Sequence, residues 1–375
     1  MPTTPTGRRV VVSELAETPV EAMEKFIRVE PMDPPDVNAL GPRDVLVRIE
    51  SASVGWVDLI MTSGQYQHVP SPPYTPGLEY AGVVVWRGEE AANKISIGNR
   101  VMVDGLLAGP RSLGEYRRWG GWASYAVAPA EAILPVPTGM SFDEACNLLG
   151  NYETAYHCLL ARGRLRAGET VLVLGASGSV GLAAVHVAKL VGAKVIAMGR
   201  SEAKLAEVAA EGADHVVVTR KEEGVLVPFR DQIKALTGGR GVDLVYDGVG
   251  GDLSLESLRC TAFGARVLIV GWAATPYVAK GKGGRGAPNA NVLPTNLIMM
   301  KGLDVLGCPT VLSTVQDPSI RAPRLAQVLE WANAGKLRPR VSHRFALSEI
   351  VEAMKTKWNG DVVGGCVVTP NSEPA

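Results

Sequence analysis

The chain has 375 residues, of which 46% are hydrophobic, and it carries 38 basic against 38 acidic residues. A chain of this length can bury two domain-sized cores. The balanced charge argues against nucleic acid or an anionic membrane surface as a main partner. No apolar run approaches the roughly 18 residues of a membrane-spanning helix, so we expect no membrane association.

The cysteines and the N-terminus bear on the compartment. Five cysteines are scattered without a CxxC pair, which suits a reducing environment. The opening residues, MPTTPTGRRVVV, lack the long apolar core of a signal peptide. We therefore expect a cytoplasmic protein, with an organelle address left open.

The first segment, to about residue 148, is expected to be a β-rich domain. Strand-like runs with β-branched residues cover 44–55, 81–85 and 100–105. Dense prolines at 69–77 require extended or turn backbone. From Ser141, a predicted N-cap with Glu144 at the capping-box position, the pattern becomes helical through residue 163.

Strands and helices alternate in the next part of the chain, which predicts a parallel, doubly wound sheet. Strands are expected at 171–174, 194–198, 215–218, 242–247, 266–270 and 304–308, with helical patterns at 180–191, 202–212 and 229–239.

The region after this alternation is less regular. Residues 273–302 interrupt the alternation of strands and helices, and they contain the stretch KGKGGRG at 280–286. This stretch is either a flexible surface loop or a lid that holds an anionic ligand. The chain then returns to helix at 324–335 and to a strand-like segment at 364–370. We expect this last part to pack back on the N-terminal domain.

A glycine-rich turn after the first of the alternating strands, VLVLGASGSVG at 171–181, predicts a dinucleotide-binding site. The three usual glycine positions hold Ala176, Gly178 and Gly181. Gly178 allows close approach of a pyrophosphate, and Gly181 allows close packing of helix on strand. The free N–H groups at the start of the helix favour the same anion. The predicted binding residues are Ala176, Ser177, Gly178, Ser179, Val180 and Gly181.

The end of the second alternating strand bears on which dinucleotide binds. NAD sites usually place a carboxylate there for the ribose hydroxyls, whereas this chain has Gly199, followed by Arg200 and Ser201, with Lys204 one turn on. A guanidinium can bind a 2′-phosphate bidentately, which favours NADPH over NADH. The alternative is that Arg200 is only a solvated residue at the start of a helix.

Four stretches together resemble the zinc-independent quinone oxidoreductase branch of the medium-chain dehydrogenase/reductase superfamily, which also includes enone and enoyl-thioester reductases. They are VGWVDLIMTSGQY (54–66), PPYTPGLEYAGVV (72–84), GASGSVG (175–181) and DLVYDGVGG (243–251). The resemblance implies an α/β fold in which a Rossmann domain (149–308) is inserted in a mostly β, GroES-like catalytic domain (1–148 and 309–375). It also implies a homodimer that pairs the edge strand at 304–308.

The same resemblance bears on zinc. Zinc-using relatives place a cysteine where this chain has Gly55 and a histidine where it has Leu78, which leaves Glu79 without fellow ligands. Residues 104–121 contain no cysteine, and the histidines show no ligand-like spacing. We predict no metal site. Hydride transfer to an acceptor already polarised by conjugation, such as a quinone or an α,β-unsaturated carbonyl, is then the feasible reaction.

The resemblance also implies site residues. Asp58 matches a position near the nicotinamide, although Gly55 replaces a frequent asparagine. Tyr66 matches a proposed proton donor, with pocket lining as the alternative. Thr154 matches a residue on the nicotinamide side.

Other site residues are predicted from their place in the pattern. We expect further cofactor contacts at the strand ends, where open parallel sheets bind ligands, namely Asp247, Gly248, Gly250 and Gly271. We also expect a pocket for a planar substrate, lined by Trp56, Asn151, Tyr152 and Trp272.

Two other functions stay open at this point. The first is reduction of an enoyl-CoA or acryloyl-CoA thioester, with CoA phosphates held by Arg111, Arg117, Arg118 or the 280–286 stretch. The second is a non-catalytic structural or interaction role on the same fold. The phosphate turn and Arg200 argue against this second alternative.

Overall fold

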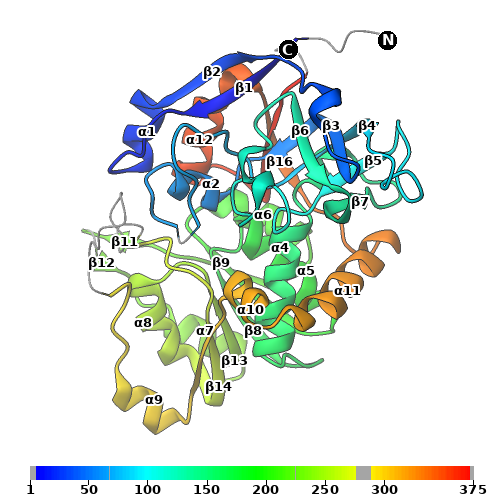
Figure 1. Ribbon diagram of the computed structural model, residues 1–375. Helices are drawn as coiled ribbons and strands as arrows, with labels where there is room; N and C mark the ends of the chain where they lie inside the picture. The colour runs from blue at the N-terminus through cyan, green and yellow to red at the C-terminus, as the bar shows by residue number, and fades with distance from the viewer. Residues whose placement is uncertain (1–5, 67, 224, 276–288, 372–375) are drawn as a thin grey trace. The chain divides into compact units, whose positions relative to one another are not determined.

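The computed structural model describes residues 6–66, 68–223, 225–275 and 289–371, and it divides into two compact units (Figure 1). Residues up to Gly150, together with those from Arg338 onward, form the first unit. The described residues between Asn151 and Leu337 form the second unit. The stretch at 280–286, which the sequence marked as a loop or lid, lies outside the described residues.

The first unit is built on a mostly antiparallel sheet in the order β16-β17-β3-β4-β5-β7, with β6 also paired to β3. Its strands are β3 (Asp44–Ser53), β4 (Tyr80–Arg87), β5 (Arg100–Val103), β6 (Tyr125–Pro129), β7 (Ile133–Pro135), β16 (Val341–Ala346) and β17 (Gly365–Thr369). A separate antiparallel pair joins β1 (Gly7–Val12) to β2 (Ile27–Met32).

Short helices surround this sheet. They are α1 (Pro19–Lys25), α2 (Trp56–Met61), α3 (Phe142–Ala145) and α12 (Ile350–Asn359), with single 3₁₀ turns η1 (Val37–Ala39), η2 (Glu115–Arg118), η3 (Ala130–Ala132) and η8 (Leu347–Glu349). Ser141 caps α3 in the predicted capping box, because its hydroxyl accepts from the Glu144 N–H and the Glu144 carboxylate accepts from the Ser141 N–H. The buried core gathers around Ile49, Tyr80 and Trp122.

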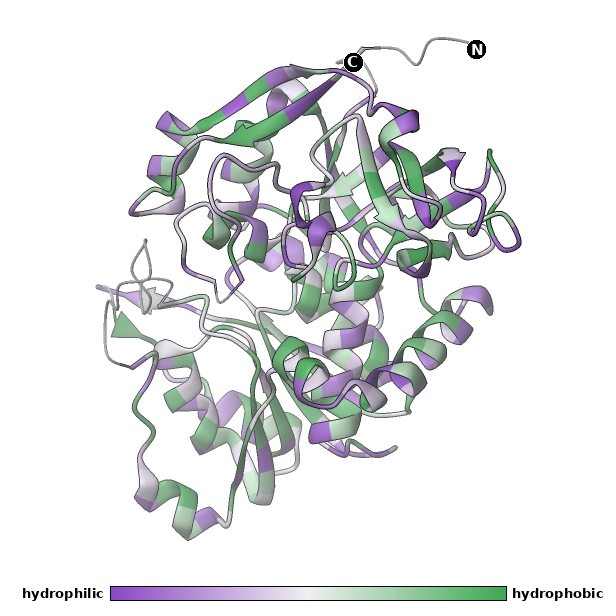
Figure 2. Ribbon diagram, in the orientation of Figure 1, coloured by the Kyte–Doolittle hydropathy of each residue, from purple (hydrophilic) through white to green (hydrophobic). Residues whose placement is uncertain are grey.

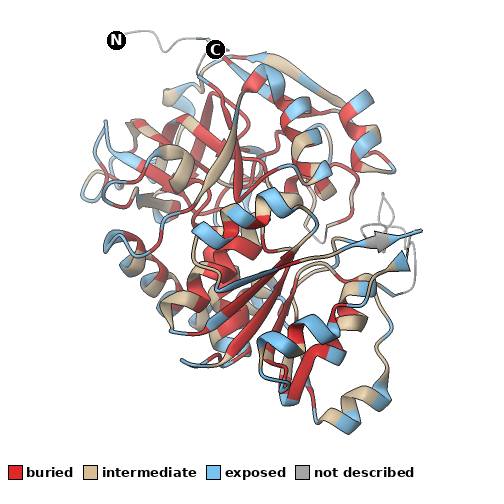
Figure 3. Ribbon diagram, turned by 180° about the vertical axis from the view of Figure 1, so that it is seen from behind, coloured by how far each residue is buried: buried red, intermediate tan, exposed pale blue. Residues whose placement is uncertain are grey.

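The second unit contains a parallel sheet in the order β10-β9-β8-β13-β14-β15. Its strands are β8 (Thr170–Leu174), β9 (Lys194–Gly199), β10 (His215–Val218), β13 (Val242–Asp247), β14 (Thr261–Ile269) and β15 (Asp304–Gly307). The central strands are hydrophobic (Figure 2) and buried along most of their length (Figure 3). The strand order reverses between β8 and β13, which is where doubly wound sheets bind ligands.

One α-helix of this unit comes before the first strand of the sheet, and the others come after its strands. In chain order the helices are α4 (Leu149–Tyr156), α5 (Ser179–Leu190), α6 (Glu202–Ala210), α7 (Arg230–Leu236), α8 (Gly251–Cys260), α9 (Thr295–Lys301), α10 (Thr310–Gln316) and α11 (Arg321–Asn333). Smaller elements are the π-helix η4 (His157–Arg162), the 3₁₀ turn η7 (Pro318–Ile320), and the strand pair β11 (Lys221–Glu222) and β12 (Val225–Leu226).

The fold class agrees with the prediction, but the return to the first unit comes later than residue 309. The described residues before Arg338, including α10 and α11, belong to the second unit. The reason is a buried ion-pair network, in which Glu153 on α4 binds Arg321 and Arg324 on α11. As expected, the last strand of the chain returns to the first unit, because β17 pairs with β3.

Candidate functional site

The turn between β8 and α5 has the geometry of a phosphate-binding loop. Gly175 has a φ of +68°, and the Gly178 N–H donates to the Gly175 carbonyl at 3.1 Å. Helix α5 begins at Ser179, and no side-chain hydrogen bond caps it at Gly178. The positive end of a helix dipole at such a turn attracts an anion.

The two glycines of this turn have different local surroundings. A Cβ on Gly181 would lie 2.3 Å from the Gly175 carbonyl oxygen, so only glycine fits there. A Cβ on Gly178 would meet only that same oxygen, at 3.5 Å, so its outer face is open. Gly181 packs helix against strand, and Gly178 leaves its outer face open. The predicted contact of Gly178 with a pyrophosphate stays a prediction.

The end of β9 presents the residues considered for a 2′-phosphate. The Gly199 carbonyl accepts from the Thr219 N–H at 2.8 Å, which fixes the strand end. Arg200 is exposed, and the Ser201 hydroxyl accepts from the Lys204 N–H at 3.4 Å to cap α6. Ser201 thus orders the start of α6 directly after the exposed guanidinium.

Asp247, predicted as a cofactor contact, instead faces into the protein. It is 1% exposed, and its Oδ1 accepts from the N–H groups of Val249 and Gly250 at 2.9 and 2.8 Å. The Ser254 hydroxyl donates to its Oδ2. Burial raises the pKa of this carboxyl, against the lowering effect of these hydrogen bonds. Asp247 therefore shapes the turn after β13, since its oxygens are already occupied by neighbours.

The turn that Asp247 shapes lies beside the segment after β14. The Gly271 N–H donates to the Asp247 carbonyl at 3.2 Å, and the Ala273 N–H donates to the Gly248 carbonyl at 3.3 Å. A Cβ on Gly248 would meet nothing within 4 Å. Trp272 is 50% exposed next to this open backbone, so the carboxyl end of the sheet presents an unobstructed glycine and an indole.

Tyr152, predicted to line the substrate pocket, lies instead in the packing of α4 against α5. Its hydroxyl is 2.7 Å from His186 Nδ1, and His186 Nε2 is 3.1 Å from the Glu211 carboxylate. Burial lowers the pKa of His186, so a neutral ring that donates from Nε2 and accepts at Nδ1 satisfies both contacts. Asn151 and Thr154, on the same helix, are only partly buried.

In the first unit, Asp58 is a buried carboxylate that organises the start of α2. Its oxygens accept from the backbone N–H groups of Gly55 and Leu78, each at 3.0 Å. Desolvation raises the pKa of Asp58 to about 6, although these hydrogen bonds and the charge of Arg111 oppose it. With 2% exposure, Asp58 positions the backbone around it.

Trp56, also predicted for the substrate pocket, stacks on Trp358 of α12. The ring centroids are 5.1 Å apart, and the planes differ by 2°. The neighbouring Lys357 is buried, which lowers its pKa to about 8 against the attraction of Cys366 and Asp58. Trp358 and Lys357 belong to no recognisable sequence motif. Their position beside Trp56 and Asp58 follows only from the packing of α12 against α2.

Tyr66, the predicted proton donor, is partly buried. Its ring meets His68 edge-on, with the centroids 6.4 Å apart. The phenol is therefore held beside an imidazole, and its predicted role stays a prediction.

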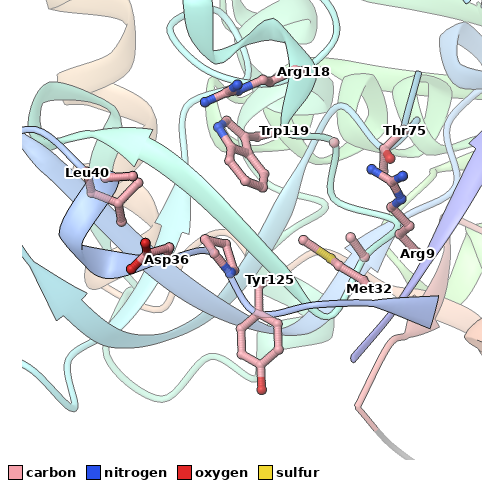
Figure 4. Close-up of a pocket in the computed structure, with 12 residues that line it drawn as sticks. Arg9, Met32, Asp36, Leu40, Thr75, Arg118, Trp119 and Tyr125 are labelled. Carbon is pink, nitrogen blue, oxygen red and sulfur yellow. The ribbon is translucent and has the colours of Figure 1, made fainter. Parts of the chain in front are cut away.

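A pocket of about 340 Å³ lies within the first unit (Figure 4). Arg118, considered above for CoA phosphates, lies over the Trp119 ring at 5.1 Å from its centroid. Apart from Arg118, none of the residues predicted for the substrate or cofactor lines this pocket. Its walls are formed by Arg9, Met32, Pro35, Asp36, Ala39, Leu40, Thr75, Arg118, Trp119, Gly120, Ala123 and Tyr125.

Comparisons with known proteins now bear on these features. Residues 41–138 match the family model described as alcohol dehydrogenase GroES-like domain, and residues 179–322 match zinc-binding dehydrogenase. Quinone oxidoreductase-like protein 2 homolog from Nematostella vectensis is 31% identical over 369 residues, covering 96% of this chain and 90% of the relative. The chain belongs to the medium-chain dehydrogenase/reductase superfamily, in its quinone oxidoreductase branch.

Solved structures agree with this family. A probable oxidoreductase from Mycobacterium abscessus is 30% identical with a TM-score of 0.77, covering 98% of this chain and 99% of that one. A mycobacterial protein complexed with NADPH, 23% identical with a TM-score of 0.74 over 97% of this chain and 100% of that one, shares the fold. The chain is therefore an oxidoreductase of the medium-chain superfamily with a Rossmann-type domain and a GroES-like domain.

The zinc-binding name of one matching family model raises the metal question again. Glu79, the remaining candidate ligand, accepts from the Gly150 N–H at 2.6 Å. Among the residues that the structure describes, there is no group of three or more His, Cys, Asp or Glu side chains that could hold a metal ion. Zinc independence remains a prediction. Also within the described ranges, no helix is both long and apolar enough to span a membrane.

Proposed function

We propose that this oxidoreductase uses NADPH to reduce a quinone or another activated α,β-unsaturated carbonyl. The observation that carries this proposal is the open glycine turn at Gly178 together with the end of β9, where Gly199 replaces the carboxylate of NAD sites and Arg200 follows. A bound nicotinamide dinucleotide supplies the hydride. The residues of this chain bind the dinucleotide and favour the form that carries a 2′-phosphate.

The turn and α5 provide the pyrophosphate site. The open face of Gly178 admits the phosphates, while the positive end of the α5 dipole attracts them. The neighbouring strand end supplies the open backbone of Gly248 and the indole of Trp272, which support the nicotinamide half.

Arg200 and Lys204 provide the preference for a 2′-phosphate. Both follow the end of β9, and the Ser201 cap orders the first turn of α6 between them. A guanidinium and an ammonium at this position attract a phosphate dianion and offer no acceptor for ribose hydroxyls.

Tyr66 is the proposed proton donor when the acceptor is an enone or a thioester. Hydride addition at the β-carbon leaves a carbanion at the α-carbon, which a phenol can protonate. A quinone takes its protons on oxygen, which exchanges readily with water, so it depends less on this residue. Tyr66→Phe therefore separates the two acceptor classes.

The test is consumption of NADPH at 340 nm with a quinone, an alkyl vinyl ketone, crotonyl-CoA and acryloyl-CoA, each repeated with NADH. Turnover with the quinone or ketone, faster with NADPH, supports the proposal. A preference for a thioester replaces it with the acyl-CoA alternative. NADPH binding without turnover on any acceptor contradicts the proposed substrate class, and absence of binding favours the non-catalytic alternative.

We also propose a homodimer formed by pairing of β15. This strand is at the edge of the parallel sheet, with β14 as its partner among the described strands. Edge strands carry backbone groups that can pair with a second chain. Light scattering after gel filtration tests this, and a monomer at micromolar concentration contradicts it.

A further inference from the structure

The proposed reductase activity makes no use of the pocket in the first unit, which has the size of a small-molecule site. Its volume is about 340 Å³, within the range of ligand pockets. Part of its lining is apolar, because Met32, Ala123 and Tyr125 belong to one buried cluster and are each at most 8% exposed. Leu40 and Trp119 pack against this cluster and also line the pocket. Such a lining favours a ligand with an apolar body.

Three charged side chains from different elements complete the lining of this pocket (Figure 4). Arg9 is on β1, Arg118 is the last residue of η2, and Asp36 directly precedes η1. Two guanidiniums against one carboxylate give the lining a net charge of +1. The pocket therefore favours a monoanion over a neutral molecule or a cation.

The two guanidiniums are available to a ligand. Both arginines are exposed, and among the described residues no carboxylate pairs with either of them. Arg118 lies over the Trp119 ring, 5.1 Å from its centroid, in a cation–π contact. Asp36 instead caps η1, since its Oδ1 accepts from the backbone N–H and the side-chain amide of Asn38, each at 3.0 Å. The positive charge of the pocket is therefore left for an incoming anion.

Backbone contacts hold the lining of the pocket in place. Arg9 is paired with β2 and also forms an antiparallel bridge to Ala123. A Cβ on Gly120 would lie 2.0 Å from the Thr75 carbonyl oxygen, so the segment that carries Trp119 packs directly on Thr75. A site held in this way is preformed, which lowers the cost of ordering it when a ligand binds.

We propose that this pocket binds a small aromatic carboxylate, at a site separate from the proposed site of reduction. The rings of the ligand lie against Met32, Leu40 and the Trp119 indole, where aromatic contact adds to apolar burial. Its carboxylate faces the guanidiniums of Arg9 and Arg118, whose planar N–H groups match a carboxylate. A phosphate dianion fits less well, because it exceeds the net charge of the lining and has no apolar body.

The experiment titrates 2-naphthoate into the folded full chain and follows binding by isothermal titration calorimetry. We expect one saturable site per chain. The neutral isostere 2-naphthamide loses the charge-assisted contact, so its Kd should be at least about tenfold higher. Acetate keeps the carboxylate but lacks the rings, so it should show no saturable binding in the same concentration range.

Variants assign the site to the pocket. Arg9→Ala and Arg118→Ala should each raise the Kd for 2-naphthoate about tenfold. Arg8→Ala is the matched control and should leave the Kd unchanged, because Arg8 is also exposed on β1 but does not line the pocket. Circular dichroism verifies that each variant folds.

Four results would overturn the proposal of a carboxylate site in this pocket. They are no saturable binding of 2-naphthoate, equal affinity for 2-naphthamide, unchanged affinity in Arg9→Ala or Arg118→Ala, and an equal loss in Arg8→Ala. The comparison of 2-naphthoate with its amide uses the wild-type chain, so it tests the proposal even where an arginine variant fails to fold.

Discussion

Asp58 and Leu78 are joined by a hydrogen bond of 3.0 Å from the Leu78 N–H to the buried Asp58 carboxylate. The second oxygen accepts from the Gly55 N–H, so the carboxylate connects the start of α2 to the segment before β4. Replacing it with an amide leaves at least one of these N–H groups facing another donor. Such an unsatisfied group costs about 1–3 kcal/mol.

Asp58→Asn should change the pH dependence of stability. Burial raises the pKa of Asp58 from the ordinary 3.8 to about 6 in the folded chain. The folded chain therefore binds more protons between these values, so the free energy of unfolding of wild type falls as pH rises from about 4 to about 6. The fall from this group is at most about 3 kcal/mol. Urea unfolding of both proteins across this range measures it, and parallel curves would refute the assignment.

Arg200→Ala should weaken NADPH far more than NADH. Loss of a charge-assisted contact to a phosphate corresponds to about a tenfold to hundredfold rise in Kd for NADPH. NADH lacks that phosphate and should change little. Fluorescence titration with both cofactors measures the two constants. Lys194→Ala removes the same charge at the opposite end of β9 and serves as the control. Equal effects of Arg200→Ala on both cofactors contradict the role of Arg200.

Gly178→Ala and Gly181→Ala should separate binding from folding. At Gly178 a methyl has space, and the φ of −72° suits alanine, so the melting temperature should be retained while the phosphates lose their close approach. We expect at least about a tenfold loss of NADPH affinity. At Gly181 the methyl would lie 2.3 Å from the Gly175 carbonyl, so the fold itself should be destabilised. Calorimetry with and without NADPH distinguishes the loss of binding in Gly178→Ala from the loss of stability in Gly181→Ala. Similar melting temperatures for the two variants would contradict these assignments.

Local patterns in the sequence predicted the parallel sheet and the glycine-rich turn between its first strand and the next helix. The expected strand at 171–174 lies within β8, and the glycines at 178 and 181 have the open and closely packed surroundings that their motif implied. These features could be predicted because a strand, a turn and the helix after it are contiguous in the chain.

Side-chain direction and distant contacts could not be predicted in the same way. The sequence placed Asp247 at a strand end but did not show that its oxygens turn back to the next N–H groups. Tyr152 meets His186, and Trp56 meets Trp358, only because helices distant in the chain pack together. The sequence likewise did not show that Glu153 on α4 binds Arg321 and Arg324 on α11.

Glu153→Gln should strongly destabilise the second unit. Glu153 is 5% exposed, and its carboxylate accepts from Arg324 Nε and Arg321 Nη2, each at 2.9 Å. Arg324 is itself 2% exposed and also donates to the Thr314 hydroxyl at 2.8 Å. Removing the negative charge leaves a buried guanidinium uncompensated, which costs about 3–5 kcal/mol.

The matched control for Glu153→Gln is Asp231→Asn. Asp231 pairs with Arg230 on α7 in the same unit, but both side chains are more than half exposed, at 86% and 52%. Water already screens that pair, so its loss should cost much less. Urea unfolding, followed by tryptophan fluorescence and far-UV circular dichroism, measures both variants. Because the network joins α4 to α11, an equal loss in the two variants would mean that the buried ion pairs do not hold these helices together.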